Sequence, residues 1–148
     1  MDIQVYCDGS GNTFDTDGGY GYRILVDGLH LVDGSGYAPK ATNNTMELTA
    51  AIEGLKKAKE YIKSYKETHE GLNIEYNVTL VSDSQLTLGY ANGAYQCKAI
   101  HLSKFYIELR NLYNELDAKT RWVKGHSGEE HNEAVDKLAK KARESKGK

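Results

Sequence analysis

The chain has 148 residues, of which 39% are hydrophobic and 27% charged, with a formal net charge of −2 and a pI near 6.2. No run of about eighteen apolar residues exists, which excludes a membrane-spanning helix, and the net charge gives no support to nucleic-acid binding. We expect a single globular domain over residues 1–148, with a frayed polar tail at 144–148.

The two cysteines, Cys7 and Cys97, belong to no CxxC motif and no Cys/His zinc spacing. The N-terminus lacks a basic stretch followed by an apolar one, so we expect no secretory signal. Together these features predict reduced thiols in a cytoplasmic protein. A disulfide between the two cysteines stays open as the alternative.

The first elements in chain order form a strand meander. Residues 3–8 alternate between apolar and other side chains with a period of two, which is typical of a strand. Asp27-Gly28 is a strong hairpin signal, because both positions of the turn need a positive φ. The predicted strands are Ile3–Asp8, Gly21–Asp27 and Leu29–Gly36.

A long helix follows the meander. Asn43 or Asn44 can cap it, Glu47 falls in its first turn, and it should end before Gly71. Beyond it the pattern alternates between strands and helices. The pattern indicates a short helix after Asp83 less clearly than it indicates the other elements. The further elements are a strand at Ile74–Ser82, a helix at Ser103–Leu116, a strand at Thr120–Lys124 and a helix at about Glu130–Arg143. This order predicts an α/β fold with a mixed sheet and helices on both faces.

Four carboxylates occupy special positions. Asp8 and Asp83 end two apolar strands, Glu47 lies early in the long helix, and Asp136 lies in the last helix. Ligands bind outside the carboxyl ends of strands in open α/β sheets, so Asp8 and Asp83 should lie side by side if their strands are parallel neighbours. Clustered carboxylates repel one another, and hard divalent cations such as Mg²⁺ or Mn²⁺ relieve that repulsion.

His126 lies in the loop Gly125-His126-Ser127-Gly128 and is a plausible proton carrier beside such a site. Each residue also has a simpler interpretation by itself. Asp8-Gly9-Ser10 could be an ordinary exit from a strand into a turn, Glu47 could be a first-turn acid that the helix dipole favours, and Asp83-Ser84 could be a helix cap. His126 could be a plain loop residue, and Asp136 an exposed ion-pair partner. Only the combination favours catalysis.

Five segments, in this order, resemble the type 1 ribonuclease H family over nearly the whole chain. They are Tyr6-Cys7-Asp8-Gly9-Ser10, Thr42-Asn43-Asn44-Thr45-Met46-Glu47-Leu48, Ser82-Asp83-Ser84-Gln85, Trp122-Val123-Lys124-Gly125-His126-Ser127-Gly128 and Asn132-Glu133-Ala134-Val135-Asp136-Lys137-Leu138-Ala139. The resemblance implies a ribonuclease H-like fold with a five-stranded mixed sheet flanked by helices on both faces. It also implies an endonuclease that cuts the RNA strand of RNA–DNA hybrids.

The resemblance further implies a role for each matched residue. Asp8, Glu47, Asp83 and Asp136 would bind two Mg²⁺ ions, with Mn²⁺ as a substitute, and His126 would assist turnover and product release. One ion would help deprotonate the attacking water and the other would stabilise the departing 3′ oxygen, leaving 5′-phosphate and 3′-hydroxyl ends. The residues that would contact the hybrid are Gly9, Ser10, Thr42, Asn43, Asn44 and Gln85, with Thr42 on a phosphate of the DNA strand.

The chain departs from the family pattern in three places. The loop Gly11 to Asp17 lacks the Asn-Pro-Gly common in bacterial members, which puts an RNA contact there in doubt. The stretch Gly89 to Leu102 is too short and too poor in Trp and Lys for the basic protrusion of many members, so we expect weaker hybrid binding. A substitute basic face could lie on the long helix, although a solvated helix surface is the favoured interpretation of its lysines, Lys56, Lys59, Lys63 and Lys66.

Two other functions share these features. A hybrid-binding module that does not cut would lack a metal ligand, whereas all four acids and the histidine are present. A DNA-cutting resolvase or transposase of the wider superfamily would share the fold, but Thr42-Asn43-Asn44 and Gln85 favour a hybrid. For the assembly state, a monomer is the default expectation.

Overall fold

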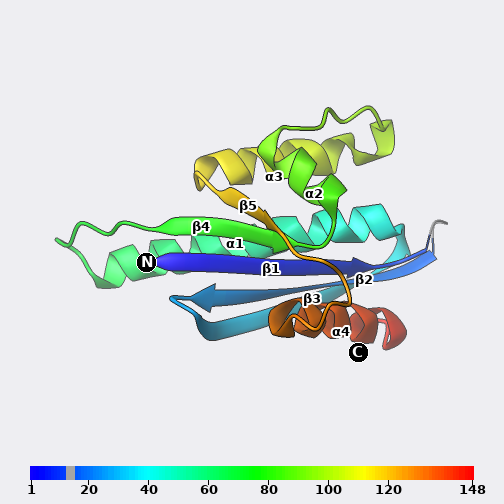
Figure 1. The fold of residues 1–148 in the computed structure, drawn as a ribbon, viewed down its shortest axis with the longest axis horizontal. Helices are drawn as coiled ribbons and strands as arrows, with labels where there is room; N and C mark the ends of the chain where they lie inside the picture. Colours follow the sequence, from blue (N-terminus) through cyan, green and yellow to red (C-terminus); the bar gives the residue numbers. More distant parts are fainter. Residues whose placement is uncertain (13–15) are drawn as a thin grey trace.

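The computed structural model describes residues 1–12 and 16–148 of the chain. Five strands form one sheet in the order β3-β2-β1-β4-β5 (Figure 1). The antiparallel meander pairs β1 with β2 and β2 with β3, while β4 and β5 add on in parallel on the other side of β1. The strands are Asp2–Ser10 (β1), Thr16–Val26 (β2), Leu29–Ala41 (β3), Asn77–Ser82 (β4) and Lys119–Trp122 (β5). The predicted mixed sheet is confirmed.

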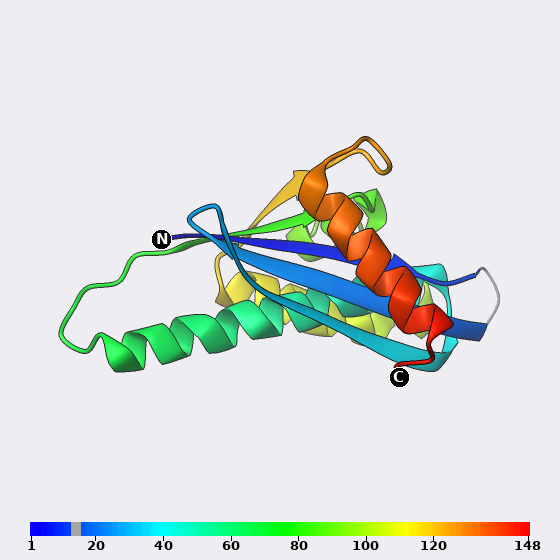
Figure 2. The ribbon, with the colours of Figure 1, turned by 90° about the horizontal axis from the view of Figure 1, so that it is seen from below.

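Helices cover both faces of this sheet. Figure 2 shows α1 on one side of the strands and α4 crossing them on the other. The helices are Asn43–Thr68 (α1), Gln85–Asn92 (α2), Ser103–Glu115 (α3) and Glu130–Glu144 (α4), with a short 3₁₀ turn, η1, at Ile100–Leu102. The short helix expected after Asp83 is α2. No helix in the described residues is long and apolar enough to cross a membrane.

Strand β1 separates two cores. Ile3, Val5 and Cys7 pack on the α1 side, while Tyr6 packs with Val135 of α4 on the other. Because successive side chains of a strand point to opposite faces, Asp8 lies on the same side as Tyr6, toward α4. Both cysteines are free, so the alternative of a disulfide between them is wrong.

The predicted hairpin at Asp27-Gly28 is confirmed, with φ of 49° and 82° at its two positions. Strands β2 and β3 nevertheless extend well beyond the predicted Gly21–Asp27 and Leu29–Gly36. Their extensions pair glycines with tyrosines, as in Gly36 opposite Tyr20. The tyrosine ring occupies the space where a β-carbon of Gly36 would lie, so the aromatic side chain completes a strand that composition alone marks as a turn.

The cap of α1 differs from the prediction. The N-cap is Thr42, not Asn43 or Asn44. Its hydroxyl accepts a hydrogen bond from the Thr45 amide at 3.2 Å, and the Thr45 hydroxyl accepts one from the Thr42 amide at 2.9 Å. This reciprocal capping box fixes the helix start and places Glu47 just past the first turn rather than within it.

The lysines of α1 lie on a partly exposed helix surface, and several of them pair with acids. Lys56 contacts Glu108 of α3 at 2.8 Å, and Lys59 contacts Glu115 of the same helix at 2.8 Å. Lys66 lies over the ring of Tyr76. Such exposed pairs contribute little stability, but they occupy the charges that a substitute hybrid-binding face would need. The solvated-surface interpretation of this helix therefore fits the structure better.

Candidate metal centre

The parallel pairing of β1 and β4 brings two strand ends together. Tyr6 is in register with Val81, so Asp8 and Asp83, two residues further along each chain, lie at the same edge of the sheet. Asp8 lies near the end of β1, which is paired with a strand on each side, and Asp83 directly follows β4. The site is thus built on rigid elements, as precise chemistry requires.

Glu47 joins these two acids from α1. Its carboxylate accepts a hydrogen bond from the Gly9 amide at 3.1 Å, and the same amide reaches Asp8 at 3.0 Å. One oxygen each from Asp8, Glu47 and Asp83 all lie within 4.8 Å of one another. Asp8 is 4% exposed and Glu47 7%, so these acids form a nearly buried cluster.

Asp136 enters from α4 on the opposite face and completes the group. Its carboxyl group lies close enough to Asp8 to help raise the pKa of that carboxyl group. It also lies within 4.8 Å of His126 and Glu133 in a second group of possible ligands. Asp136 therefore connects the buried acids with the exposed loop histidine, and the structure brings together all five residues that the sequence singled out for chemistry.

The electrostatics show how unfavourable this cluster is without a cation. Burial, helped by the neighbouring Asp83 and Asp136, raises the pKa of Asp8 to about 8. Burial and Asp8 raise the pKa of Glu47 well above its ordinary value. Burial also raises the pKa of Asp83, against a hydrogen bond from Asn132 that lowers it. Closely spaced carboxylate oxygens that repel one another are suitable ligands for hard divalent cations, because the positive charge of the cation relieves the repulsion.

The stability of the metal-free protein should therefore depend on pH. These acids have folded-state pKa values above their unfolded ones, so their contribution is full below about pH 4 and is lost as pH rises through about 8. In EDTA we expect the free energy of unfolding to be about 2 kcal/mol lower at pH 9 than at pH 5. Urea unfolding at both pH values measures this, and Mg²⁺ should restore most of the loss at pH 9. An equal loss with and without Mg²⁺ would contradict the site.

Three residues beside the acids had no assigned role in the sequence. Asn132 is 2% exposed, donates to Asp83, and has a buried side-chain oxygen without a partner among the described residues. Trp122 donates its indole N–H to the backbone oxygen of Asp83 at 3.2 Å, and Glu133 faces His126. Asn132 and Glu133 lie four and three residues before Asp136 on the same helix, so helical spacing places them on the face of Asp136, a signal that the sequence analysis did not use.

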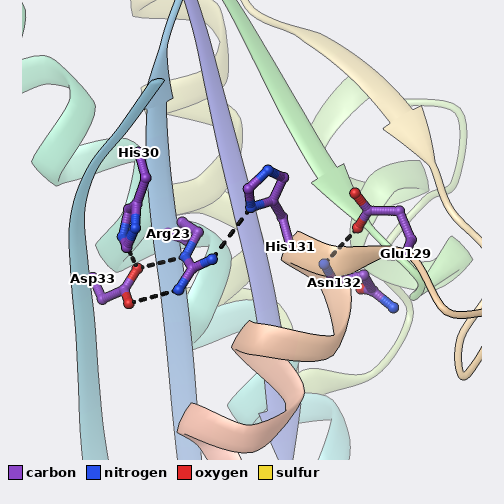
Figure 3. A network of polar contacts seen from close by, with 6 residues as sticks. All are labelled: Arg23, His30, Asp33, Glu129, His131 and Asn132. Carbon is purple, nitrogen blue, oxygen red and sulfur yellow. Dashed lines mark hydrogen bonds and ion pairs between the residues drawn. The ribbon is translucent and has the colours of Figure 1, made fainter. Parts of the chain in front are cut away.

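A polar network fixes α4, and hence Asp136, to the sheet (Figure 3). Arg23 of β2 makes two hydrogen bonds to Asp33 of β3, at 2.8 and 3.0 Å, and a third polar contact to His131 of α4 at 3.2 Å. Glu129 caps α4 by accepting from the Asn132 amide. The bidentate Arg23–Asp33 pair is rigid in geometry, so the start of α4 is held in one position.

The expected hybrid-contacting residues surround the acids. Asn43, Asn44 and Gln85 are exposed at the starts of α1 and α2, and Ser10 is half-buried at the end of β1. Gly9 is buried, and the space for its missing β-carbon is filled by the backbone of α1. His126 is exposed with φ of 54°. Within the loop from Gly11 to Asp17, residues 13–15 lie outside the described residues.

Comparison with known proteins gives the relatives of the chain. The RNase H family model matches residues 1–144. Ribonuclease H of Treponema denticola is 32% identical, with 96% of this chain and 97% of the relative covered. That of Acetivibrio thermocellus is 36% identical over 93% and 91% of the two chains.

Solved structures agree on the fold. RNase H1 from Halobacterium salinarum superposes with a TM-score of 0.78 at 24% identity, covering 98% of this chain and 99% of that one. LC11-RNase H1, solved in complex with an RNA/DNA hybrid, superposes with a TM-score of 0.76 at 22% identity over 97% and 98% of the chains. The family model and the relatives agree along nearly the whole length: the chain belongs to the RNase H family.

Proposed function

We propose that this protein is an endonuclease that hydrolyses the RNA strand of RNA–DNA hybrids and leaves 5′-phosphate and 3′-hydroxyl ends. The observation that carries the proposal is the convergence of Asp8, Glu47, Asp83 and Asp136 from β1, α1, β4 and α4 at one edge of the sheet. The relatives named ribonuclease H, and a structural neighbour solved with an RNA/DNA hybrid, support the substrate class.

Asp8, Glu47, Asp83 and Asp136 would hold two Mg²⁺ ions, with Mn²⁺ able to substitute. Bound divalent cations would supply the charge that activates water and stabilises the departing oxygen in phosphodiester hydrolysis. Asp8 shares contacts with the other three acids, which supports a position between the two ions. The amide of Gly9 holds the Glu47 carboxylate in place, and Asn132 holds that of Asp83.

The substrate would be recognised around this edge. Asn43, Asn44 and Gln85 offer exposed amides that can both donate to and accept from 2′-hydroxyls and base edges in a wide, shallow minor groove. Ser10 and the backbone at Gly9 would approach the RNA strand. Thr42 would hold a phosphate of the DNA strand, since it lines a groove beside α1 whose other walls include Lys40 and His101.

A side-by-side cleavage assay tests the function. We expect cleavage of an RNA–DNA hybrid in Mg²⁺, and none of double-stranded DNA or double-stranded RNA at the same concentration. Analysis of the product ends should find 5′-phosphates and 3′-hydroxyls. Cleavage of double-stranded DNA would favour a resolvase-like or transposase-like activity. Binding of the hybrid without cleavage, in both Mg²⁺ and Mn²⁺, would favour a binding module.

His126 is expected to speed turnover without being indispensable. It is exposed, lies in a loop between glycines, and faces Asp136 and Glu133. His126→Ala should lower kcat by about 100-fold, the low end of what a positioned proton carrier contributes, because this imidazole is exposed. Steady-state hydrolysis of a labelled hybrid measures this. His69→Ala, at the far end of α1, is the matched control, and an unchanged kcat in His126→Ala would remove the histidine from the mechanism.

We further propose a cytoplasmic monomer. The two free thiols, one of them buried in the core, support a reducing compartment. Sedimentation at micromolar concentration tests the assembly state, and a stable dimer would contradict it.

A further inference from the structure

The end of α4 carries a concentration of positive charge. Residues 137–148 hold six of the nineteen basic residues of the chain and only one of its twenty-one acidic residues. The helix dipole stabilises lysines near a helix C-terminus, but that effect is confined to the last turn. The basic residues here begin at Lys137 and continue past the helix, so the dipole does not explain the whole set.

Part of this charge lines a groove that lies beside the candidate metal centre. The groove has a volume of 540 Å³ and lies between the start of β2 and the last turns of α4, which Figure 2 shows side by side. One wall carries hydroxyl and amide groups, from Ser10, Asn12 and Thr16; the other carries cations, from Lys140, Arg143 and Lys146. We call it the α4 groove.

The α4 groove adjoins the acids at both walls. Ser10 lies two residues after Asp8 on β1, and Lys140 contacts the Asp136 carboxylate at 3.1 Å. From Asp136 to Glu144, the last residue of α4, the helix rises about 12 Å, at 1.5 Å per residue. That length corresponds to roughly three to four nucleotides at about 3.4 Å each along one strand.

Fewer of the cations in the groove than of those on α1 are paired with a carboxylate in the described residues. Within residues 1–12 and 16–148, Arg143 and Lys146 have no carboxylate within ion-pair distance, whereas Lys56 and Lys59 each have one at 2.8 Å. Two acids also line the groove, Asp17 and Glu144. Asp17 accepts a hydrogen bond from the Tyr37 hydroxyl at 2.6 Å, so one of them is already engaged.

Lys146 adds an independent observation. Its φ is 52°, in the left-handed region where helix ends favour glycine, and a lysine there costs conformational energy. Gly147 follows it with φ of 77°. The chain thus keeps a charged side chain at a position where glycine would fold better, and that side chain lines the groove.

We propose that the α4 groove binds the phosphodiester backbone of the hybrid beyond the cleavage point. Lysine and arginine neutralise phosphates, while the hydroxyls and amide of the facing wall can donate to phosphate oxygens. The groove supplies positive charge beside the acids, whereas residues 93–99 form no helix and the α1 lysines Lys56 and Lys59 face acids. This inference rests on the hybrid being the substrate.

Lys146→Gly is the sharpest test, because folding and binding should change in opposite directions. The melting temperature is expected to rise by about 2 °C as the left-handed strain is relieved. The affinity for a 20-base-pair hybrid, measured in Mg²⁺ in the Asp8→Asn background, is expected to fall about threefold. Arg143→Gln combined with Lys146→Gln should lower the affinity about tenfold. It should also reduce the slope of log K against log salt by about 0.7–0.9 per lost contact.

Lys63→Gln is the matched control, because it removes one exposed lysine about 24 Å along α1 from Glu47, at 1.5 Å per residue. It should leave the affinity and the salt slope unchanged. Hybrids extended past the cleavage point on only one side should show the groove effect for one of the two directions. Equal affinities for the wild type and the groove variants would overturn the inference, as would an equal loss in Lys63→Gln. If the wild type instead fails to cleave the hybrid at all, the proposed function itself fails.

Discussion

Asp8→Asn is expected to lower hybrid cleavage by at least about 1000-fold while making the metal-free protein more stable at alkaline pH. Asp8 is the acid that contacts the other three, so its loss removes a charge from the centre of the ligand set. Asparagine has nearly the same shape but is a neutral and much weaker ligand for hard cations. Loss of one shared ligand should therefore disturb the whole centre.

The stability change follows from the same burial. With a pKa of about 8, Asp8 must ionise in a nearly buried position when the pH rises to 9. Asparagine avoids this, so Asp8→Asn should raise the free energy of unfolding at pH 9 in EDTA by about 2 kcal/mol. Near-wild-type turnover in Mg²⁺ would refute the ligand assignment. A variant that is inactive and also destabilised at pH 9 would instead indicate misfolding.

Gly9→Ala is expected to damage both the fold and the activity. A β-carbon at Gly9 would lie 2.3 Å from the Glu47 nitrogen and 2.4 Å from the Met46 carbonyl carbon, and both are backbone atoms. Backbone cannot turn aside as a flexible side chain can, so the start of α1 must move away from β1. We expect a loss of about 2–3 kcal/mol of stability, typical of overpacking in a core.

The activity should fall by at least about 100-fold, because the shift separates Glu47 from Asp8 and breaks the hydrogen bond from the Gly9 amide. Urea unfolding and hybrid cleavage at a temperature where the variant is fully folded measure the two effects. Gly71→Ala is the matched control: its added methyl meets open space, and φ of 86° costs only about 1 kcal/mol. Full activity in Gly9→Ala would show that the close approach of α1 and β1 is not needed.

The sequence predicted the fold wherever a single local signal decides the geometry. The Asp27-Gly28 turn needs two positive φ values, and apolar alternation marks β1. The extensions of β2 and β3 were missed because the need for glycine there comes from residues that are distant in the sequence. A β-carbon on Gly19 would lie 2.2 Å from the backbone oxygen of Ala139, so α4 needs glycine there. The partner is far away in sequence, and no local pattern contains it.

The candidate site divides in the same way. Its acids were predictable because Asp8 and Asp83 lie at or near the ends of apolar strands, and because all four acids stand in segments with characteristic neighbours. The Arg23–Asp33–His131 network was not predictable. Asp33 lies ten residues and His131 lies 108 residues from Arg23 in the sequence, and only the fold brings the three together. The cap of α1 was assigned to asparagine by general preference, whereas Thr45 at the third helical position makes Thr42 the better cap.

The scattering of the four acids along the chain has a consequence for biosynthesis. Asp8, Glu47 and Asp83 are synthesised early, but Asp136 is carried by the last helix. A nascent polypeptide therefore lacks a full set of ligands until α4 has left the ribosome and docked on the sheet. Cleavage would therefore be delayed until Asp136, the last of the four acids to be synthesised, joins the other three.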